Sequence, residues 1–412
     1  MVEPGAPAED SARPGLLFLC HRLPFPPNKG DKIRSYHLLK YLSAHYRVYL
    51  GAFVDDPADW VHAGKVEALC EAVCLVKLNP KLARLKSLSG LCAGRALSLP
   101  YYSSWRMARW VKQLAADKDI TRVVVYSSVM AQYVSGDYAA CLKVADMVDV
   151  DSEKWREYAQ RQRFPMNWVY AREASCLLRF EQTVAKTFDR SLFVSTAEAD
   201  KFKELAPQYA DRISSYSNGV DTDYFCPEWA CPSPYEQNES VLVFTGAMDY
   251  WPNIDAVTWF AKQVFPALYN TNPQLRFYIV GSNPTAQVRG LADGPGVVVT
   301  GGVPDVRPYL RHGLLAVAPM HIARGIQNKV LEAMAMALPV IVSAPALEGI
   351  DAEHGRDVLL AMQMDDYAAL VEDVLAGKYS YIGRQARDKV KQKFNWGQNL
   401  PIVGRLLEGD TR

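Results

Sequence analysis

Residues 313 to 343 read GLLAVAPMHIARGIQNKVLEAMAMALPVIVS and contain one strand, one loop, one helix and a second strand. The two ends, GLLAVAPM and PVIVS, are short apolar runs of the length that buried strands have, and apolar residues recur with helical spacing between them. Strands joined through a helix run parallel, so this stretch predicts a βαβ unit. Its loop, HIARGIQN, brings the start of a helix to the carboxyl edge of a sheet.

The same rhythm of short apolar runs and helix-like segments extends along most of the chain. It stops once, at the Asn-, Gly-, Asp- and Pro-rich segment YSNGVDTDYFCPEWACPSPYEQNES, and then restarts. We therefore predict an α/β protein with two Rossmann-like, doubly wound domains that face each other across a cleft. The predicted strands are 15–20, 48–54, 73–78, 122–127, 143–150 and 191–195, then 241–245, 275–281, 297–301, 314–319 and 339–343.

These patterns divide the 412 residues into five parts. We expect a flexible tail (1–14), an N-terminal domain (15–215), a linker (216–240), a C-terminal domain (241–395) and a last helix (396–412). The last helix is expected to pack back on the N-terminal domain. No apolar run reaches the roughly 20 residues of a membrane span, and the tail lacks the features of a signal peptide. We therefore expect a cytoplasmic protein.

Charge and cysteine content exclude several classes of protein. The formal charge is +1, so no field over the whole molecule draws it to nucleic acid, and no nucleic-acid partner is expected. The eight cysteines form no C-x-x-C pair, which favours reduced core residues over a metal site. Three acids near a strand end, Asp146, Asp149 and Asp151, have no histidine partner in sequence, so we expect neither metal nor cofactor.

The loop and helix start at residues 321–332 are a predicted anion site. Free backbone N–H groups and the positive end of the helix dipole favour an anion there, and Gly325 lets the backbone pass close to it. Lys329 sits in the first turn, where a cation is unfavourable unless an anion is bound, and Arg324 adds a second cation. Glu332, three residues after Lys329, has the chemistry to accept hydrogen bonds from a ribose diol. The alternative is an ordinary solvated Lys/Glu pair.

Four motifs resemble the family 4 glycosyltransferases, which are retaining enzymes of GT-B fold that use nucleotide-diphospho-sugars. They are LEAMAMALPVIVS, SNGVDTDYF, VFTGAM and LPFPPNKGDKIRS. A more specific resemblance is to a subgroup associated with exosortase (PEP-CTERM) exopolysaccharide clusters. The motifs that carry it are PFPPNKGDKIRS, VDVDSEKW, TGAMDYWPNIDAV and ARGIQNKVLEAMAM. The resemblance covers almost the whole chain. It implies a GT-B enzyme that binds a nucleotide-sugar donor.

The chain departs from the family pattern at the donor site. The family has two glutamates separated by seven residues; the second, which binds the donor ribose, falls on Glu332, but the first falls on Arg324. A basic pair of the family appears here as Ala247 and Asn253. We therefore expect Lys329 and Arg324 to meet the phosphate charge, and we assign Arg324, Lys329 and Glu332 to catalysis.

Further substrate-binding positions are predicted at loops that follow strands. In the N-terminal domain they are Gly30 and Arg34, which by resemblance reach donor phosphate and acceptor, and His21, Asp149 and Asp151. In the C-terminal domain they are Gly246, Gly281, His321, Gly325 and Asn328. Several of these positions also have a structural explanation. Asp151, and Asp31 next to Gly30, have the pattern of helix caps, and lone histidines are usually structural.

Residues 77–112 carry eight basic residues and no acid, interleaved with leucine, tyrosine and tryptophan. This composition suits the surface of an anionic membrane, and a solvated basic face is the alternative. We expect peripheral contact with a membrane through these residues, at the inner face of the cytoplasmic membrane.

The expected function is transfer of a sugar from a nucleotide-diphospho-sugar to a glycan or polyprenyl-linked acceptor in polysaccharide biosynthesis, with retention of configuration. A nucleotide-sugar 2-epimerase of the same fold is a first rival, which would need acid and base groups that only the Asp146 to Asp151 cluster offers. A non-catalytic subunit that binds sugar nucleotide or glycan is the second, suggested by the missing first glutamate.

Overall fold

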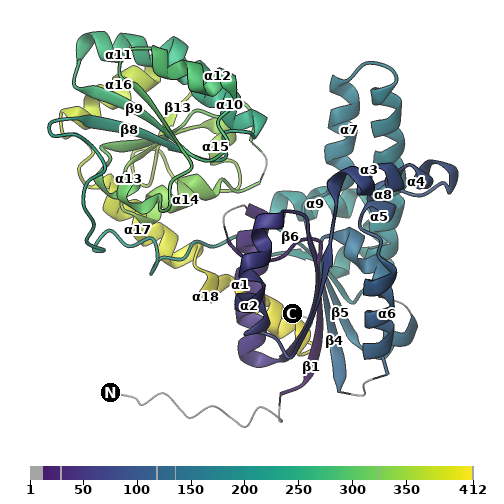
Figure 1. The fold of residues 1–412 in the computed structure, drawn as a ribbon. Helices are drawn as coiled ribbons and strands as arrows, with labels where there is room; N and C mark the ends of the chain where they lie inside the picture. Colours follow the sequence, from purple (N-terminus) through teal and green to yellow (C-terminus); the bar gives the residue numbers. More distant parts are fainter. Residues whose placement is uncertain (1–12, 28–29, 117–118, 135, 324, 411–412) are drawn as a thin grey trace, which may run out of the picture. The chain divides into compact units, whose positions relative to one another are not determined.

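The computed structural model describes residues 13–27, 30–116, 119–134, 136–323 and 325–410. The chain forms two compact units. Unit 1 holds the chain up to Tyr216 together with Leu400 and the residues after it, and unit 2 holds Ser217–Asn399. Each unit is built on one parallel sheet (Figure 1).

Unit 1 has a seven-stranded sheet in the order β3-β2-β1-β4-β5-β6-β7, with every neighbouring pair parallel. The central strand β1 is buried along its whole length, which requires cover on both faces. In Figure 1, α1 and α18 lie on one side of the sheet and α6 and α8 on the other. The strands are β1 (Gly15–Cys20), β2 (Arg47–Val54), β3 (Ala72–Lys77), β4 (Ile120–Tyr126), β5 (Leu142–Val148), β6 (Arg190–Phe193) and β7 (Ile213–Ser215).

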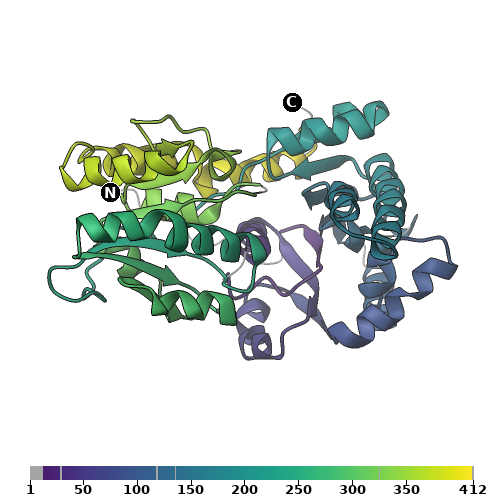
Figure 2. The ribbon, with the colours of Figure 1, turned by 90° about the horizontal axis from the view of Figure 1, so that it is seen from above.

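The helices of unit 1 follow the βαβ pattern, with an extra group of short helices between β3 and β4. They are α1 (Gly30–His45), α2 (Ala63–Glu67), α3 (Pro80–Ser87), α4 (Ser89–Cys92), α5 (Ser98–Tyr101), α6 (Trp105–Leu114), α7 (Asp151–Arg161), α8 (Met166–Thr187) and α9 (Thr196–Leu205). Figure 2 looks down α7 and α8 nearly along their axes and shows them side by side. Trp155 on α7 packs on Tyr170 on α8, with ring centroids 5.2 Å apart.

Unit 2 has a six-stranded parallel sheet in the order β10-β9-β8-β11-β12-β13. Its strands are β8 (Ser240–Thr245), β9 (Leu275–Val280), β10 (Val297–Gly301), β11 (Leu315–Ala318), β12 (Val340–Ser343) and β13 (Leu359–Ala361). Its helices are α10 (Trp251–Trp259), α11 (Phe265–Thr271), α12 (Ala286–Arg289), α13 (Arg307–His312), α14 (Asn328–Ala335), α15 (Ala344–Leu347), α16 (Met364–Leu375) and α17 (Ile382–Lys393). In Figure 1, α10, α11 and α16 cover one face, and α13, α14 and α17 the other.

The predicted architecture of two doubly wound sheets is confirmed. All eleven predicted strands are present within a few residues of their predicted bounds. The sequence patterns missed β7 and β13, which are three residues long and too short to show a period. Both lie at an edge of their sheet.

The chain returns to unit 1 through α18 (Trp396–Leu407). The hydroxyl of Tyr46 donates to the carboxylate of Glu408 at 2.6 Å, and the guanidinium of Arg122 donates to the Leu407 carbonyl at 2.9 Å. The segment that we expect to link the domains lies in unit 2 from Ser217 onward, where Arg387 donates to the carbonyl of Phe225. Apart from the gaps named above, no helix of this chain is long and apolar enough to cross a membrane.

Candidate functional site

The start of α14, in unit 2, presents a lysine next to an amide. The ammonium of Lys329 donates to Oδ1 of Asn253, at the start of α10, at 2.6 Å, and lies 4.8 Å from the centre of the Phe244 ring. Burial lowers the pKa of Lys329 to about 8, against the opposing effect of Glu332. In the described part of the chain, no carboxylate lies within ion-pairing distance of this ammonium. Among the described residues, the cation is therefore held in place by neutral groups, with Glu332 acting on it only from beyond ion-pairing distance.

Glu332 lies three residues after Lys329 on the same helix. Burial raises the pKa of its carboxyl to about 7, and the nearby Lys329 partly offsets that rise. Among the residues that the structure describes, no partner donates a hydrogen bond to this carboxylate. A pair of hydrogen-bond donors from a ligand, such as a vicinal diol, would satisfy it.

The first turn of α14 is also free of a side-chain cap. The residue before the helix, Gln327, does not cap it, and Oδ1 of Asn328 is buried with no hydrogen-bond partner among the described residues. Gly325 takes a positive φ of 62°, as a glycine readily does. Arg324, the second predicted cation, lies outside the described residues. The uncapped turn beside Lys329 has the properties of an anion site.

Gly246 and Gly281 lie together at the carboxyl ends of β8 and β9. A Cβ on Gly281 would lie 1.6 Å from the carbonyl oxygen of Gly246, and a Cβ on Gly246 would lie 2.7 Å from the amide nitrogen of Asn253. That amide also donates to the carbonyl of Ala247 at 2.9 Å. The two glycines therefore allow the close packing that orients Asn253 toward Lys329. Their predicted contact with substrate stays a prediction.

His321 lies near this site, on the loop after β11. Its Nδ1 is 2.8 Å from a carboxylate oxygen of Asp255, and its ring meets Trp259 edge to face at 4.9 Å. It borders a cavity of about 220 Å³. The cavity is lined by side chains that include Trp259, Met320, His321, Ser343, Met362 and Tyr367. Met320 also lies against the Lys329 ammonium, with the sulfur 3.8 Å away, so the cavity and the lysine site are neighbours.

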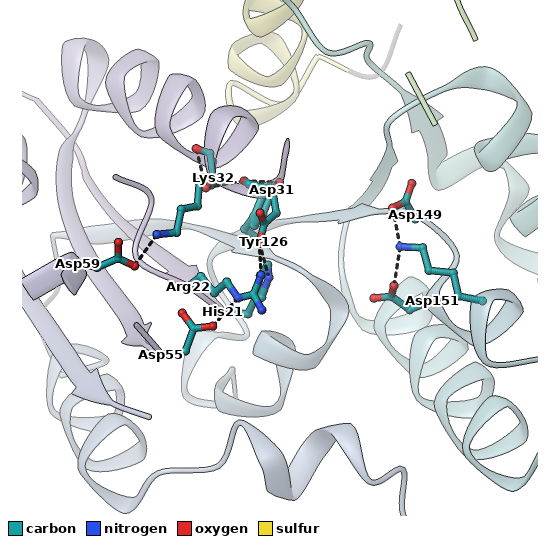
Figure 3. A network of polar contacts seen from close by, with 11 residues as sticks. His21, Arg22, Asp31, Lys32, Asp55, Asp59, Tyr126, Asp149 and Asp151 are labelled. Atoms are coloured by element: carbon teal, nitrogen blue, oxygen red, sulfur yellow. Dashed lines mark hydrogen bonds and ion pairs between the residues drawn. The ribbon is translucent and has the colours of Figure 1, made fainter. Parts of the chain in front are cut away.

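In unit 1, His21 and Arg22 follow β1 and contact the first turn of α1 (Figure 3). Arg22 binds Asp31 and Asp55, each at 2.9 Å, and Nε2 of His21 lies 3.5 Å from Asp31. Burial would raise the pKa of Asp31, but His21 and Arg22 hold it well below its ordinary value. The His21 ring stacks on Tyr126, and its Nδ1 has no partner in the described part of the chain.

This network corrects one reading and leaves others as predictions. Asp31 lies inside α1 and binds Arg22, so it is not the cap that precedes the helix. Gly30 is the first residue of α1 and is exposed. His21 sits at the boundary between β1 and β4, where the chain reverses direction across the sheet, and such points often bind ligands.

Arg34 is inside unit 1. Its guanidinium binds both carboxylate oxygens of Asp146, at 2.9 and 3.1 Å, and stacks on the Tyr216 ring, 3.6 Å from its centre. The side chain is fully buried, and the Tyr216 hydroxyl donates to the same carboxylate. In this arrangement Arg34 ties α1 to β5 and to the end of unit 1.

Asp149 and Asp151 are brought together by Lys154, whose ammonium lies 2.6 and 3.1 Å from their carboxylates (Figure 3). The expected cap at Asp151 is wrong: α7 begins at this residue, after Val150, and its carboxylate pairs with Lys154 one turn later. Just before the pair, Val148 takes a φ of 68°, which is unusual for a β-branched residue. The cluster is a compact group of two carboxylates and one ammonium at the end of β5.

Three partners in these sites were missed from sequence. Arg22 and Lys154 are ordinary loop and helix residues in the sequence, and Asp55 lies 33 residues from Arg22. The predicted positions form one group in unit 2, around Lys329, and separate groups in unit 1. The departure of Asn253 from the family pattern was the signal that led to the Lys329 contact.

Comparison with known proteins supplies further findings. Residues 239–376 match the family described as glycosyl transferases group 1. A search of curated protein sequences finds no match. The solved structure of sucrose-phosphate synthase from Thermosynechococcus elongatus is similar, with a TM-score of 0.67 at 16% identity over 96% of this chain and 99% of that one.

Two further solved structures share the fold. Anabaena HepE in complex with UDP and glucose has a TM-score of 0.65 at 15% identity, over 97% of this chain and 100% of that one. WaaG, described as a glycosyltransferase involved in lipopolysaccharide biosynthesis, has a TM-score of 0.64 at 15% identity, over 96% and 100% of the two chains. At such identities the likeness establishes the arrangement of two sheets.

Proposed function

We propose that the chain, whose residues 239–376 match the group 1 glycosyl transferases and whose fold is shared by solved glycosyltransferases, transfers a sugar from a nucleotide-diphospho-sugar to a glycan or lipid-linked acceptor, with retention of configuration. One observation carries the proposal: a buried lysine at the start of α14 that contacts Asn253 and, among the described residues, no carboxylate directly, with Glu332 one turn further on. A diphosphate would bind at Lys329 and the helix start, and the donor ribose would bind at Glu332.

The identity of residue 253 supports the role of Lys329. By resemblance to family 4, position 253 is where a lysine normally meets the donor phosphate. A lysine there would bring a second cation to the atom that Lys329 now contacts, and like charges in a buried site repel strongly. Asparagine instead accepts a hydrogen bond from Lys329. The phosphate-binding charge is thus proposed to have moved from α10 to α14.

The proposed chemistry needs charge stabilisation at the leaving group. A nucleoside diphosphate leaves with developing negative charge, and a fixed ammonium and helix N–H groups stabilise such charge before the reaction begins. Lys329 is oriented by Asn253 and Phe244 and has no neutralising partner in the described chain, so it requires little reorganisation. The similar HepE structures are complexes with UDP and glucose and with UDP-glucose, which supports a nucleotide sugar as the class of donor.

We propose that unit 1 binds the acceptor substrate. His21 offers a buried, unpartnered Nδ1 within the described residues, and Asp149 and Asp151 lie at the end of β5. The motifs quoted above favour the exosortase-associated subgroup and hence a polyprenyl-linked acceptor at the inner face of the cytoplasmic membrane. The α3 helix supports peripheral contact through residues 77–112, because Leu82, Leu85 and Leu88 are all exposed.

Donor screening tests this function. The full chain is heated with a panel of nucleotide-diphospho-sugars, and a matched donor should raise the melting temperature through mass action. The best donor is then incubated with a lipid-linked acceptor extract, and sugar transfer is measured. Stabilisation followed by transfer supports the proposal. Epimerised donor in the absence of acceptor would contradict the proposal and indicate a 2-epimerase. Donor binding with no turnover across the panel would contradict it and indicate a non-catalytic binding subunit.

A further inference from the structure

The helical hairpin α7–α8 in unit 1 ends in exposed apolar side chains. Phe164, in the turn, is 81% exposed, and Trp168, in the first turn of α8, is 58% exposed. Met166 lies between them and is also exposed. Single exposed apolar residues are common, but three within five positions at the end of a projecting hairpin form a patch that needs explanation. We call residues 164–168 the hairpin tip.

The hairpin holds its tip firmly. Near the tip, Tyr170 packs on Trp155 and Tyr158, with ring centroids 5.2 and 6.3 Å apart. At the base, the carboxylate of Glu181 accepts from the backbone N–H and the hydroxyl of Ser152, at 3.2 and 2.5 Å. Figure 1 shows the two helices standing out beyond the sheet of unit 1. An apolar tip on a rigid support loses little conformational entropy when it binds.

A second exposed apolar surface lies beside the hairpin, on α3. Leu82 and Leu85 are 64% and 67% exposed, and Leu88 follows them at the same spacing of three residues. We call these three leucines the α3 face. They lie on one side of the helix because residues three apart are neighbours on a helix surface. Their exposure makes the α3 face a surface without a partner among the residues that the structure describes.

The two surfaces are neighbours in unit 1. Arg172 on α8 donates to the carbonyl oxygens of Gly90 and Arg95, at 2.8 and 3.1 Å. Leu88 lies two residues before Gly90, and Trp168 lies one helical turn before Arg172. Met166 is six residues from Arg172, so the tip projects about 9 Å beyond that contact at 1.5 Å per residue. This length matches the roughly 5–10 Å by which interfacial helices enter a bilayer.

The charges around both surfaces are mostly positive, although Glu157 and Glu173 flank the hairpin tip. Residues 77–112 and 158–172 together carry eleven of the 46 Lys and Arg residues of the chain and none of its 45 Asp and Glu residues. The whole chain is nearly neutral, so this is a strong local asymmetry. Basic side chains near a membrane surface contribute about 1 kcal/mol each with anionic lipids. Apolar and aromatic groups ringed by arginine and lysine suit the boundary between headgroups and acyl chains.

We propose that the α7–α8 hairpin tip inserts into the interface of an anionic membrane, while the α3 face lies on the same surface. The occupant of this surface is a bilayer containing anionic lipid. The tip adds a second, deeper attachment to the one proposed for residues 77–112. Two attachments fix the orientation of unit 1 as well as its distance from the lipid.

Vesicle flotation of the full chain tests the hairpin. One set of vesicles is phosphatidylcholine alone, and the other is equal parts phosphatidylcholine and phosphatidylglycerol. We expect binding to the anionic set at low salt, and at least tenfold weaker binding to the neutral set. The variant Phe164→Ser with Trp168→Ser should lower partitioning to anionic vesicles at least tenfold. Its fold should be unchanged because both side chains are exposed, which circular dichroism checks.

Val61→Ser is the matched control, because Val61 is 80% exposed on unit 1 but belongs to neither surface. It should bind vesicles as the unaltered chain does. Absence of binding to anionic vesicles at low salt would overturn the proposal. Unchanged binding by the hairpin variant would also overturn it, because the vesicles would then be bound through basic residues without insertion of the tip. Donor stabilisation in solution should be the same in all variants, so failure here is distinguishable from failure of the proposed transferase function.

Discussion

Buried cations in the two units have different kinds of partner. In unit 1, Arg34 binds Asp146 and Lys32 binds Asp59, so these buried cations have carboxylate partners at 2.5 to 2.9 Å. In unit 2, Lys329 has a neutral amide and an aromatic ring for partners. Charges paired within the protein hold elements together, whereas a charge without a counter-ion is available to a ligand. The contrast indicates that unit 1 uses these charges for structure and unit 2 uses Lys329 for binding.

Breaking a pair in unit 1 should give the largest effect. Asp146→Ala leaves the Arg34 guanidinium buried without its carboxylate and removes the acceptor of the Tyr216 hydroxyl. We expect a loss of about 3–5 kcal/mol in the free energy of unfolding, measured by urea denaturation. Lys329→Met is the matched change in unit 2. It should leave stability equal or higher, because it removes a charge that burial disfavours. Equal losses in both variants would refute the contrast.

The pH dependence of donor affinity sharpens the contrast. Burial lowers the pKa of Lys329 to about 8, so its ammonium loses the proton as the pH rises through 8. A bound diphosphate raises this pKa, and donor affinity should therefore be greatest between about pH 7, above which the Glu332 carboxylate is charged, and pH 8, and fall by up to tenfold per pH unit above pH 8. Calorimetric titration from pH 7 to 9.5 measures this. Lys329→Met should show no such fall.

In the protein without donor, the contribution of Lys329 to the free energy of unfolding should rise with pH, whereas donor affinity should fall. An unfolded lysine keeps its proton up to about pH 10.4, whereas Lys329 in the folded chain releases it near 8. Between these values the unfolded state binds more protons, so the contribution of Lys329 to the free energy of unfolding rises with pH. A contribution that falls with pH in this window, judged against Lys329→Met, would mean that the lysine has a carboxylate partner after all.

A smaller effect is expected at the end of α14. Ala337 has a φ of 54°, and the bonds from its N–H to Met334 and from Leu338 to Ala333 form a Schellman motif. Glycine takes this conformation without strain, so Ala337→Gly should stabilise the chain by about 1 kcal/mol. Ala335→Gly, inside the same helix, should destabilise it. Thermal unfolding compares the two variants, and a loss of stability in Ala337→Gly would contradict the strain.

Sequence was most informative where a pattern is local. Strand β1 was predicted with its bounds because six consecutive apolar residues between turn signals have few other readings. The three-residue strand β7 was missed because it is too short to carry a period. Lys329 was identified as unusual from its place in a helix start.

Long-range pairs were beyond the reach of sequence patterns. Arg22 meets Asp55 only because the parallel strands β1 and β2 bring their ends to the same edge of the sheet. Arg34 meets Asp146 only because the fold brings α1 to β5. Arg34 was predicted to contact substrate, yet the pair with Asp146 buries it. The misread cap at Asp151 has a local cause, because the helix begins one residue earlier than the capping pattern suggests. Such differences of one residue are common at helix ends.

The affinity of Lys329→Met for a nucleoside diphosphate tests the central claim most directly. Isothermal calorimetry at pH 7 would compare it with the unaltered chain, with Lys154→Met in unit 1 as the control. We predict that Lys329→Met weakens binding on the order of 100-fold, as expected for loss of a buried charge-assisted contact to phosphate, while the control binds normally. Undiminished affinity in Lys329→Met would contradict the assignment of the phosphate to this lysine.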